Sequence, residues 1–209
     1  TFIFFEIMSF TSYVWVVFDE RTESKKAAET YLAVAVIGGM VMLMGLFILY
    51  DMLGTLLFGK IKEAAEQMLL ADVSGAGKRR LYVAAGLLLF GFGAKAGCFP
   101  LHIWLPKAHP QAPAPASALL SGILTKAGIF GIVVISCILF WNDQRWGMLI
   151  ALLGLITMFI GAMLALFSIN LKRTLACSSI SQIGFILTGI GMSCLLQAAG
   201  EDRGLAVRG

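Results

Sequence analysis

Charged residues are scarce in this sequence: they make up 13% of its 209 residues, against about 25% in an average soluble domain. Hydrophobic residues make up 59%, and the mean hydropathy is +0.88. This composition excludes an intrinsically disordered chain, which needs low hydrophobicity and high charge. It also argues against a water-soluble globular domain. The sequence therefore predicts a multi-pass integral membrane protein, with the lipid bilayer as one of its partners.

Residues that build metal and redox sites are also few. The sequence has two histidines and four cysteines, and the widely spaced cysteines form no CxxC pair. It contains no metal-ligand cluster, nucleophile triad or dinucleotide-binding fingerprint, so we expect no cofactor, no metal and no catalytic centre of its own. The net charge of +4 comes from basic residues between apolar runs rather than on one polar face. This arrangement anchors a protein to lipid headgroups and argues against a nucleic-acid partner.

Long apolar runs are what the sequence has in abundance. A bilayer crossing needs about 20 apolar residues, and six runs qualify or nearly so: 2–18, 31–50, 81–99, 117–141, 147–169 and 177–197. Only helices satisfy their own backbone in lipid, and the strands of a barrel would alternate polar and apolar residues. We therefore expect an all-α membrane bundle of about six spans, with residues 1–209 as one domain. Residues 60–71 have the spacing of a short amphipathic helix at the interface.

All five prolines fall within residues 99–115. Proline removes a backbone donor and breaks helices, so the third span is expected to break there, with Pro100 and Pro106 at the break. The same stretch also carries Ile103, Trp104 and Leu105, which are too apolar for an ordinary solvated loop. Irregular backbone at membrane depth is tolerated only inside protein or beside a water cavity. A broken helix within the membrane is the prediction.

Three ionisable residues lie within the apolar runs: Glu6, Lys95 and Lys126. Each costs about 2.5–3.5 kcal/mol to insert, so each needs a partner or water. One interpretation is an ion or proton pathway; the other is charges that reach the interface from near the ends of spans. Histidine titrates near neutral pH, and His102, surrounded by apolar residues, is a better candidate for proton transfer than His109.

Several stretches resemble a known family. The central one reads Lys95-Ala-Gly-Cys-Phe-Pro-Leu-His-Ile-Trp-Leu-Pro-Lys-Ala-His-Pro, and it is followed by Ala112-Pro-Ala-Pro-Ala-Ser-Ala-Leu-Leu-Ser-Gly and Lys126-Ala-Gly. Together with the segments beginning at Phe5 and Leu171, it is similar to the antiporter-like subunits of respiratory complex I, membrane-bound hydrogenases and Mrp-type sodium/proton antiporters.

The resemblance implies a fold of about 14 transmembrane helices with two inverted repeats, of which this chain would be a fragment. It implies a proton pathway through Glu6, Lys95 and Lys126, with His102 beside the break. The sequence has Asn170 where the family usually has Asp, which puts a salt bridge there in doubt.

The expected function is translocation of protons or another cation, such as sodium, by a non-redox subunit. Its partners would be other membrane subunits of an NADH-quinone oxidoreductase-like complex, a hydrogenase or a cation/proton antiporter, in a bacterial or archaeal cell membrane. The alternative is a structural subunit that stabilises a larger complex without moving ions, in which Glu6 and Lys95 form a static ion pair.

Overall fold

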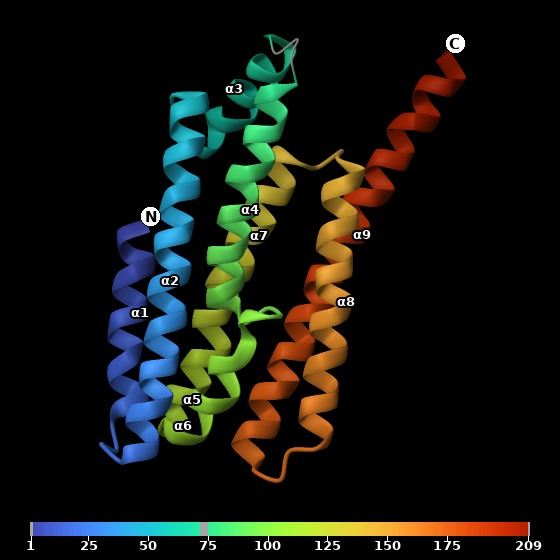
Figure 1. Ribbon diagram of the computed structural model, residues 1–209. Coiled ribbons are helices and arrows are strands. Elements are labelled where there is room, and N and C mark those ends of the chain that lie inside the picture. The colour runs from blue at the N-terminus through green and yellow to red at the C-terminus, as the bar shows by residue number, and fades with distance from the viewer. Residues whose placement is uncertain (1, 72–74, 209) are drawn as a thin grey trace.

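The computed structural model describes residues 2–71 and 75–208, with side chains described for 2–70 and 75–200. Within these ranges the chain consists of helices and connectors without a strand, which confirms the all-α prediction. Most helices follow one long axis and form an elongated bundle (Figure 1). The elements are α1 (Phe2–Val17), α2 (Thr22–Leu53), α3 (Phe58–Ala71), α4 (Ala76–Ala96), the 3-10 segment η1 (Leu101–Trp104), α5 (Leu105–Gln111), α6 (Ala114–Leu119), the π-helical segment η2 (Leu120–Leu124), α7 (Thr125–Leu139), α8 (Gln144–Leu166) and α9 (Leu171–Arg208).

Among the described residues, five helical segments are long and apolar enough to cross a membrane: Thr22–Leu53, Ala76–Gln111, Ala114–Leu139, Gln144–Leu166 and Leu171–Gly200. The remaining predicted run corresponds to α1, an apolar helix of 16 residues. Several helices extend beyond the apolar runs: α2 begins at Thr22, nine residues before the run at 31–50. A search for apolar residues finds only the apolar part of a helix. The helix itself can continue through further turns of charged residues, which such a search leaves out.

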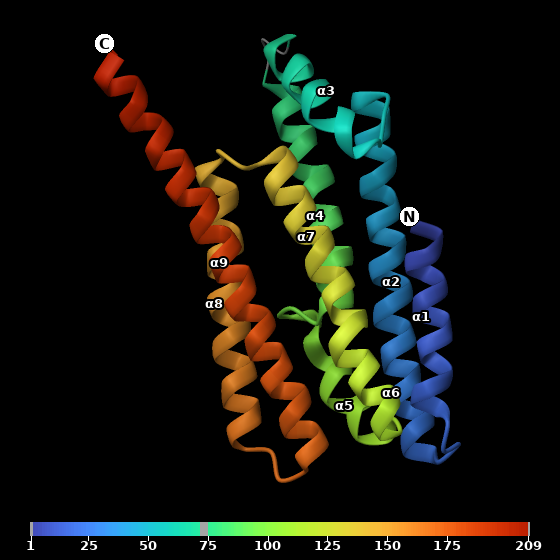
Figure 2. The same ribbon diagram turned by 180° about the vertical axis from the view of Figure 1, so that it is seen from behind.

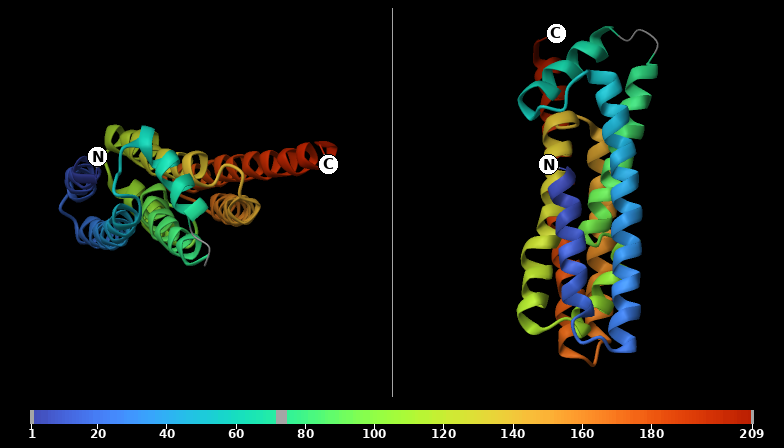
Figure 3. Two further views of the ribbon diagram at one scale, coloured as in Figure 1. Left: turned by 90° about the horizontal axis from the view of Figure 1, so that it is seen from above. Right: turned by 90° about the vertical axis from the view of Figure 1, so that its left-hand side faces the viewer.

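The first part of the bundle is a row of packed helices. α1 packs on α2, α2 packs on α4, and α4 packs on α7. α8 and α9 form an antiparallel pair along the other side of the bundle, as seen from behind in Figure 2. α3 lies across one end of the bundle, and the last turns of α9 lean away from it (Figure 3). The break after α4 therefore lies between the α1–α2 pair and the α8–α9 pair.

The helix break begins before the first proline. α4 ends at Ala96, and Gly97 takes the left-handed conformation (φ 81°), which glycine adopts without steric penalty. The N–H groups of Gly97 and Cys98 both donate to the carbonyl of Gly93, at 2.8 and 2.9 Å. Helical structure resumes in η1 and α5, so the segment is a broken helix, as predicted. Pro100 directly precedes η1.

Two contacts hold the broken segment in place. A carbonyl that loses its helical partner must find another donor, and the indole N–H of Trp104 donates to the carbonyl of Ala94 at 2.9 Å. The N–H of Phe99 donates to the Thr157 hydroxyl of α8 at 3.1 Å. Pro106 is the second residue of α5, where a missing N–H costs nothing, so it begins a helix rather than ending one.

Candidate functional site

Lys95 lies in the last turn of α4 and is only 3% exposed. Its ammonium donates to the backbone carbonyl of Phe5 at 3.2 Å and to the hydroxyl of Ser9. The nitrogen also lies 4.6 Å from the centroid of the Phe5 ring, in a cation–π contact. A buried charge needs such compensation. All three partners are neutral groups of α1, so the ammonium has no bonded counter-ion among the residues that the structure describes.

Glu6 lies on α1 between the two residues that bind Lys95. Its carboxylate packs against Gly39 of α2, and its Oε1 is buried without a hydrogen-bond partner in the part of the chain that the structure describes. No ion pair within 4.0 Å joins Glu6 to Lys95 among the described residues. The structure therefore places Glu6 on the same helix, α1, that binds Lys95, but the two side chains form no direct salt bridge.

A set of hydroxyl groups extends from Lys95 across α1 to α2. Ser9 and Ser12 are fully buried on α1, and Ser12 shares a hydrogen bond of 2.5 Å with the Tyr31 hydroxyl of α2. Tyr31 also lies 3.4 Å from the backbone carbonyl of Ser9. Sequence reasoning missed these residues, although Glu6, Ser9 and Ser12 have the i, i+3 spacing that puts side chains on one helix face.

Lys126 is in the first turn of α7, directly after the π-helical segment η2. Its ammonium donates to the carbonyl of Ser121 at 3.1 Å, and the Thr125 hydroxyl donates to the same oxygen at 2.7 Å. The wider turn of a π-helix redirects carbonyls, and such segments are frequent at functional sites. Lys126 was predicted to be functional because it lies deep in an apolar run. In the structure, the place of its ammonium depends on the irregular π-helical turn before it.

Lys126 is exposed to a cavity of about 490 Å³ between α5–α7 and α9. Polar side chains in its lining include His109 and Lys172 as well as Ser117, Ser121, Ser178, Ser179 and Gln182. His109 is 4% exposed, and its Nε2 has no hydrogen-bond partner within the described residues. The structure therefore brings His109, the less favoured histidine in the sequence, to the same cavity as Lys126.

His102 lies in η1 and lines a different cavity, of about 680 Å³. Its ring stacks on Phe99 with 5.9 Å between ring centroids, and its Nδ1 is buried without a partner in the described part of the chain. Neither Glu6, Lys95 nor Lys126 lines this cavity. The structure thus distributes the predicted site residues over three places: the α1–α4 contact and two cavities.

Asp143, in the connector between α7 and α8, fixes one end of the bundle. Its carboxylate accepts hydrogen bonds from the N–H groups of Arg145 and Trp146 at the start of α8, and from the Tyr82 hydroxyl of α4. Burial alone would raise the pKa of Asp143, but these hydrogen bonds and Lys78, at 3.7 Å, hold it below its ordinary value. The role of this cluster is structural, because the carboxylate caps α8 and ties it to α4.

Comparison with known proteins bears on this arrangement. Residues 1–200 match the family described as NADH:quinone oxidoreductase/Mrp antiporter, transmembrane. The chain is 34% identical over 194 residues to Hydrogenase-4 component B of Escherichia coli, in a match that covers 91% of the chain and 27% of that relative. It is 31% identical over 200 residues to a Na⁺/H⁺ antiporter subunit of Alkalihalophilus pseudofirmus, in a match that covers 95% of the chain and 39% of that relative.

Solved structures have the same fold. A subunit in the structure of the Mrp complex from a Dietzia species superposes with a TM-score of 0.78 at 28% identity, over 91% of this chain and 35% of that one. The chain thus spans about a quarter to two fifths of the length of the proteins that it matches. These relatives are subunits of multisubunit membrane complexes or are named as antiporter subunits.

Proposed function

Because the chain belongs to the NADH:quinone oxidoreductase/Mrp antiporter transmembrane family, we propose that it is the part of an antiporter-like membrane subunit that carries protons, or another cation such as sodium, through the bilayer. The observation that carries the proposal is Lys95, a buried ammonium held by neutral groups of α1 rather than by a bonded carboxylate. Ionisable side chains inside a membrane bundle are costly and mark ion pathways.

Glu6 controls in this proposal whether Lys95 keeps its proton. A carboxylate near an ammonium stabilises the charged form, so the neutralisation or movement of Glu6 favours proton release from Lys95. Two features support this role. Glu6 lies between the two α1 residues that bind Lys95, and its Oε1 is not tied down by a hydrogen bond in the described part of the chain.

Lys126 passes the proton sideways along the membrane toward α9. Its ammonium lines a cavity that several hydroxyl groups also line, and its bond to the Ser121 carbonyl is a neutral contact that can be exchanged. Hydroxyl and amide groups on the cavity wall can support the water molecules that proton transfer requires. His102, at the other cavity, is the group that exchanges protons beside the break.

The driving force comes from the complex in which the whole subunit resides. The names of the relatives suggest a hydrogenase, an NADH-quinone oxidoreductase or a sodium/proton antiporter, and the same pathway would serve each of them. In this proposal the chain holds no redox centre, and the neighbouring subunits supply either the redox reaction or the second half of the antiport.

The test is Lys126→Ala in the full-length subunit, assembled in its complex and reconstituted into proteoliposomes. Proton and sodium movement would be followed with a pH-sensitive dye and a sodium-sensitive dye, and assembly by the amount of intact complex. We expect transport to be abolished while the complex still assembles and any partner redox activity persists.

The matched control is Lys62→Ala, which removes an exposed lysine of α3 that lines neither cavity. This variant should transport normally. Normal transport by an assembled Lys126→Ala complex would contradict the proposal and favour the structural alternative. The two dyes also distinguish protons from sodium as the ion that crosses.

A further inference from the structure

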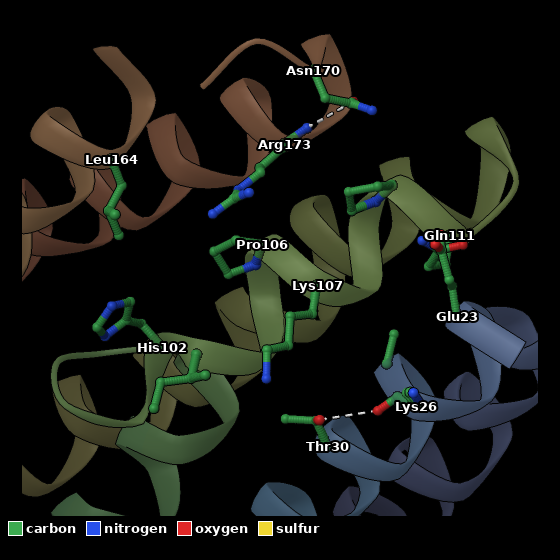
Figure 4. Close-up of a pocket in the computed structure, with 13 residues that line it drawn as sticks. Glu23, Lys26, Thr30, His102, Pro106, Lys107, Gln111, Leu164, Asn170 and Arg173 are labelled. Carbon is green, nitrogen blue, oxygen red and sulfur yellow. Dashed lines mark hydrogen bonds between the residues drawn. The ribbon is translucent and has the colours of Figure 1, made fainter. Parts of the chain in front are cut away.

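The cavity of about 680 Å³ lies where α2 begins, α5 ends and α9 begins, and its lining is rich in positive charge. Three cations from three different helices line it: Lys26 of α2, Lys107 of α5 and Arg173 of α9. Figure 4 shows Arg173, Lys107 and His102 extending around the same space. Glu23 is the one acidic residue among those that line the cavity, so the cations exceed the acids by three to one.

The three cations are exposed side chains without a bonded partner among the described residues. In the part of the chain that the structure describes, the side chains of Lys26, Lys107 and Arg173 form neither an ion pair nor a hydrogen bond. The other cavity differs in this respect. There, Lys126 donates to the Ser121 carbonyl at 3.1 Å and Lys172 donates to the Ala112 carbonyl at 2.9 Å. The larger cavity therefore has unused donors and uncompensated charge.

We propose that this cavity binds a phosphate-bearing anion, and that the headgroup of an anionic phospholipid supplies it. A guanidinium matches phosphate oxygens with paired hydrogen bonds, and lysines add charge without demanding one geometry. Basic pockets between transmembrane helices are typical of lipid headgroup sites. A volume of about 680 Å³ is within the range of small-molecule pockets, about 300–1,000 Å³.

The apolar part of the lining favours a lipid over a free ion. Ile103 and Leu164 line the same cavity, together with Pro106 and Pro110. Ile103 is 53% exposed although it is a large apolar side chain. A phospholipid would pair its phosphate with the three cations and its glycerol and upper acyl carbons with these apolar groups, as an amphipathic ligand requires.

Asn170 offers a test that leaves the cations in place. Its side chain lines the cavity, and its Oδ1 accepts hydrogen bonds from the N–H groups of Lys172 (3.0 Å) and Arg173 (3.4 Å) at the start of α9. Aspartate caps a helix as well as asparagine does. Asn170→Asp therefore keeps the start of α9 and adds one negative charge to the lining. Asn170→Ser also retains a capping oxygen but adds no charge.

The experiment measures lipid binding to the full subunit in its purified, delipidated complex. Phosphatidylglycerol and phosphatidylcholine would be titrated separately, and bound lipid counted by native mass spectrometry, with and without excess inorganic phosphate. We expect the native protein to prefer phosphatidylglycerol. Arg173→Gln and Asn170→Asp should each weaken that binding about tenfold, through a lost or opposed charge-assisted contact. Asn170→Ser and Lys25→Gln, a neighbouring α2 lysine outside the lining, should bind as the native protein does.

The arms of the experiment separate the sources of the anion. If phosphatidylglycerol binding weakens in Arg173→Gln and Asn170→Asp but not in Asn170→Ser, a lipid headgroup occupies the cavity. If inorganic phosphate binds with the same dependence and the lipid does not, the anion comes from solution, and the phosphate site stands. Equal binding of both lipids that neither variant alters would overturn the proposal. A loss of lipid binding in Asn170→Ser equal to that in Asn170→Asp would also overturn the proposal, because the loss would then come from disturbing the start of α9 and not from the added charge.

Lipid binding can be measured separately from ion transport, although His102 lines the same cavity. Lys126→Ala, expected to abolish transport, should leave lipid binding unchanged, because Lys126 does not line this cavity. The two proposals can therefore fail separately.

Discussion

Gly39 of α2 lies against the carboxylate of Glu6, so a side chain at this position would enter occupied space. A Cβ there would be 2.8 Å from Glu6 Cδ and 3.1 Å from Oε2, and closer still to Oε1. Ordinary contact between carbon atoms needs about 3.5–4.0 Å, so Gly39→Ala would push the carboxylate away by roughly 1 Å. The carboxylate is the far end of a flexible side chain, so it can move without the backbone.

The expected result is a loss of transport without a loss of stability. Alanine in a helix interior is more favourable than glycine by about 0.5–1 kcal/mol, which offsets the small strain. A displacement of about 1 Å can slow a reaction between positioned groups by up to about 100-fold. We expect proton transport to fall at least about tenfold. The assay is dye-monitored proton uptake by proteoliposomes, normalised to the amount of assembled complex.

The matched control is Gly86→Ala, since Gly86 is a helical glycine of α4 at which an added Cβ would have no heavy atom within 4 Å. This variant should transport and assemble normally. If Gly39→Ala transports at the native rate, the position of the Glu6 carboxylate does not govern the pathway, and the reasoning is refuted.

Two further predictions concern the structure that supports the site. Trp104→Phe removes the hydrogen bond to the Ala94 carbonyl, and we expect a loss of about 1 kcal/mol of stability, measured as a lower Tm. Asp143 has a folded pKa below its ordinary value of 3.8, so its contribution is present above about pH 4 and is lost as the pH falls through the folded pKa. Asp143→Ala removes the capping oxygen, so it should lower the Tm at neutral pH and reduce the further drop on acidification; an unchanged Tm at neutral pH would contradict the capping role.

The broken helix could be predicted from the sequence near residues 99–115, but the residue at which the helix stops could not. Five prolines in a short apolar stretch imply a break, because each removes a backbone donor. The break itself begins at Gly97, where the chain takes a left-handed conformation, before the first proline. Pro106 lies in the first turn of α5, where it begins a helix, and Pro110 lies inside the same helix. Proline limits where a helix can continue, whereas the surrounding packing decides where it stops.

The candidate site was predictable only in part. Lys95 stands out because a charge in an apolar run is expensive, and its burial agrees with that reasoning. Its partner Ser9 lies 86 residues away in the sequence. A serine in an apolar helix can satisfy itself on its own backbone, so it gives little signal. The cavity at Lys126 depends on the approach of α9 and on the π-helical turn, which no hydropathy pattern marks.

The most direct test of the central claim is ion transport by the double variant Glu6→Leu/Lys95→Leu in the assembled complex. Replacing both residues avoids leaving one buried charge without compensation, so assembly should survive. If the pair carries protons, transport should be lost while the amount of complex stays the same. If the double variant transports ions at the native rate, Glu6 and Lys95 have only a structural role, and the proposed proton pathway is wrong.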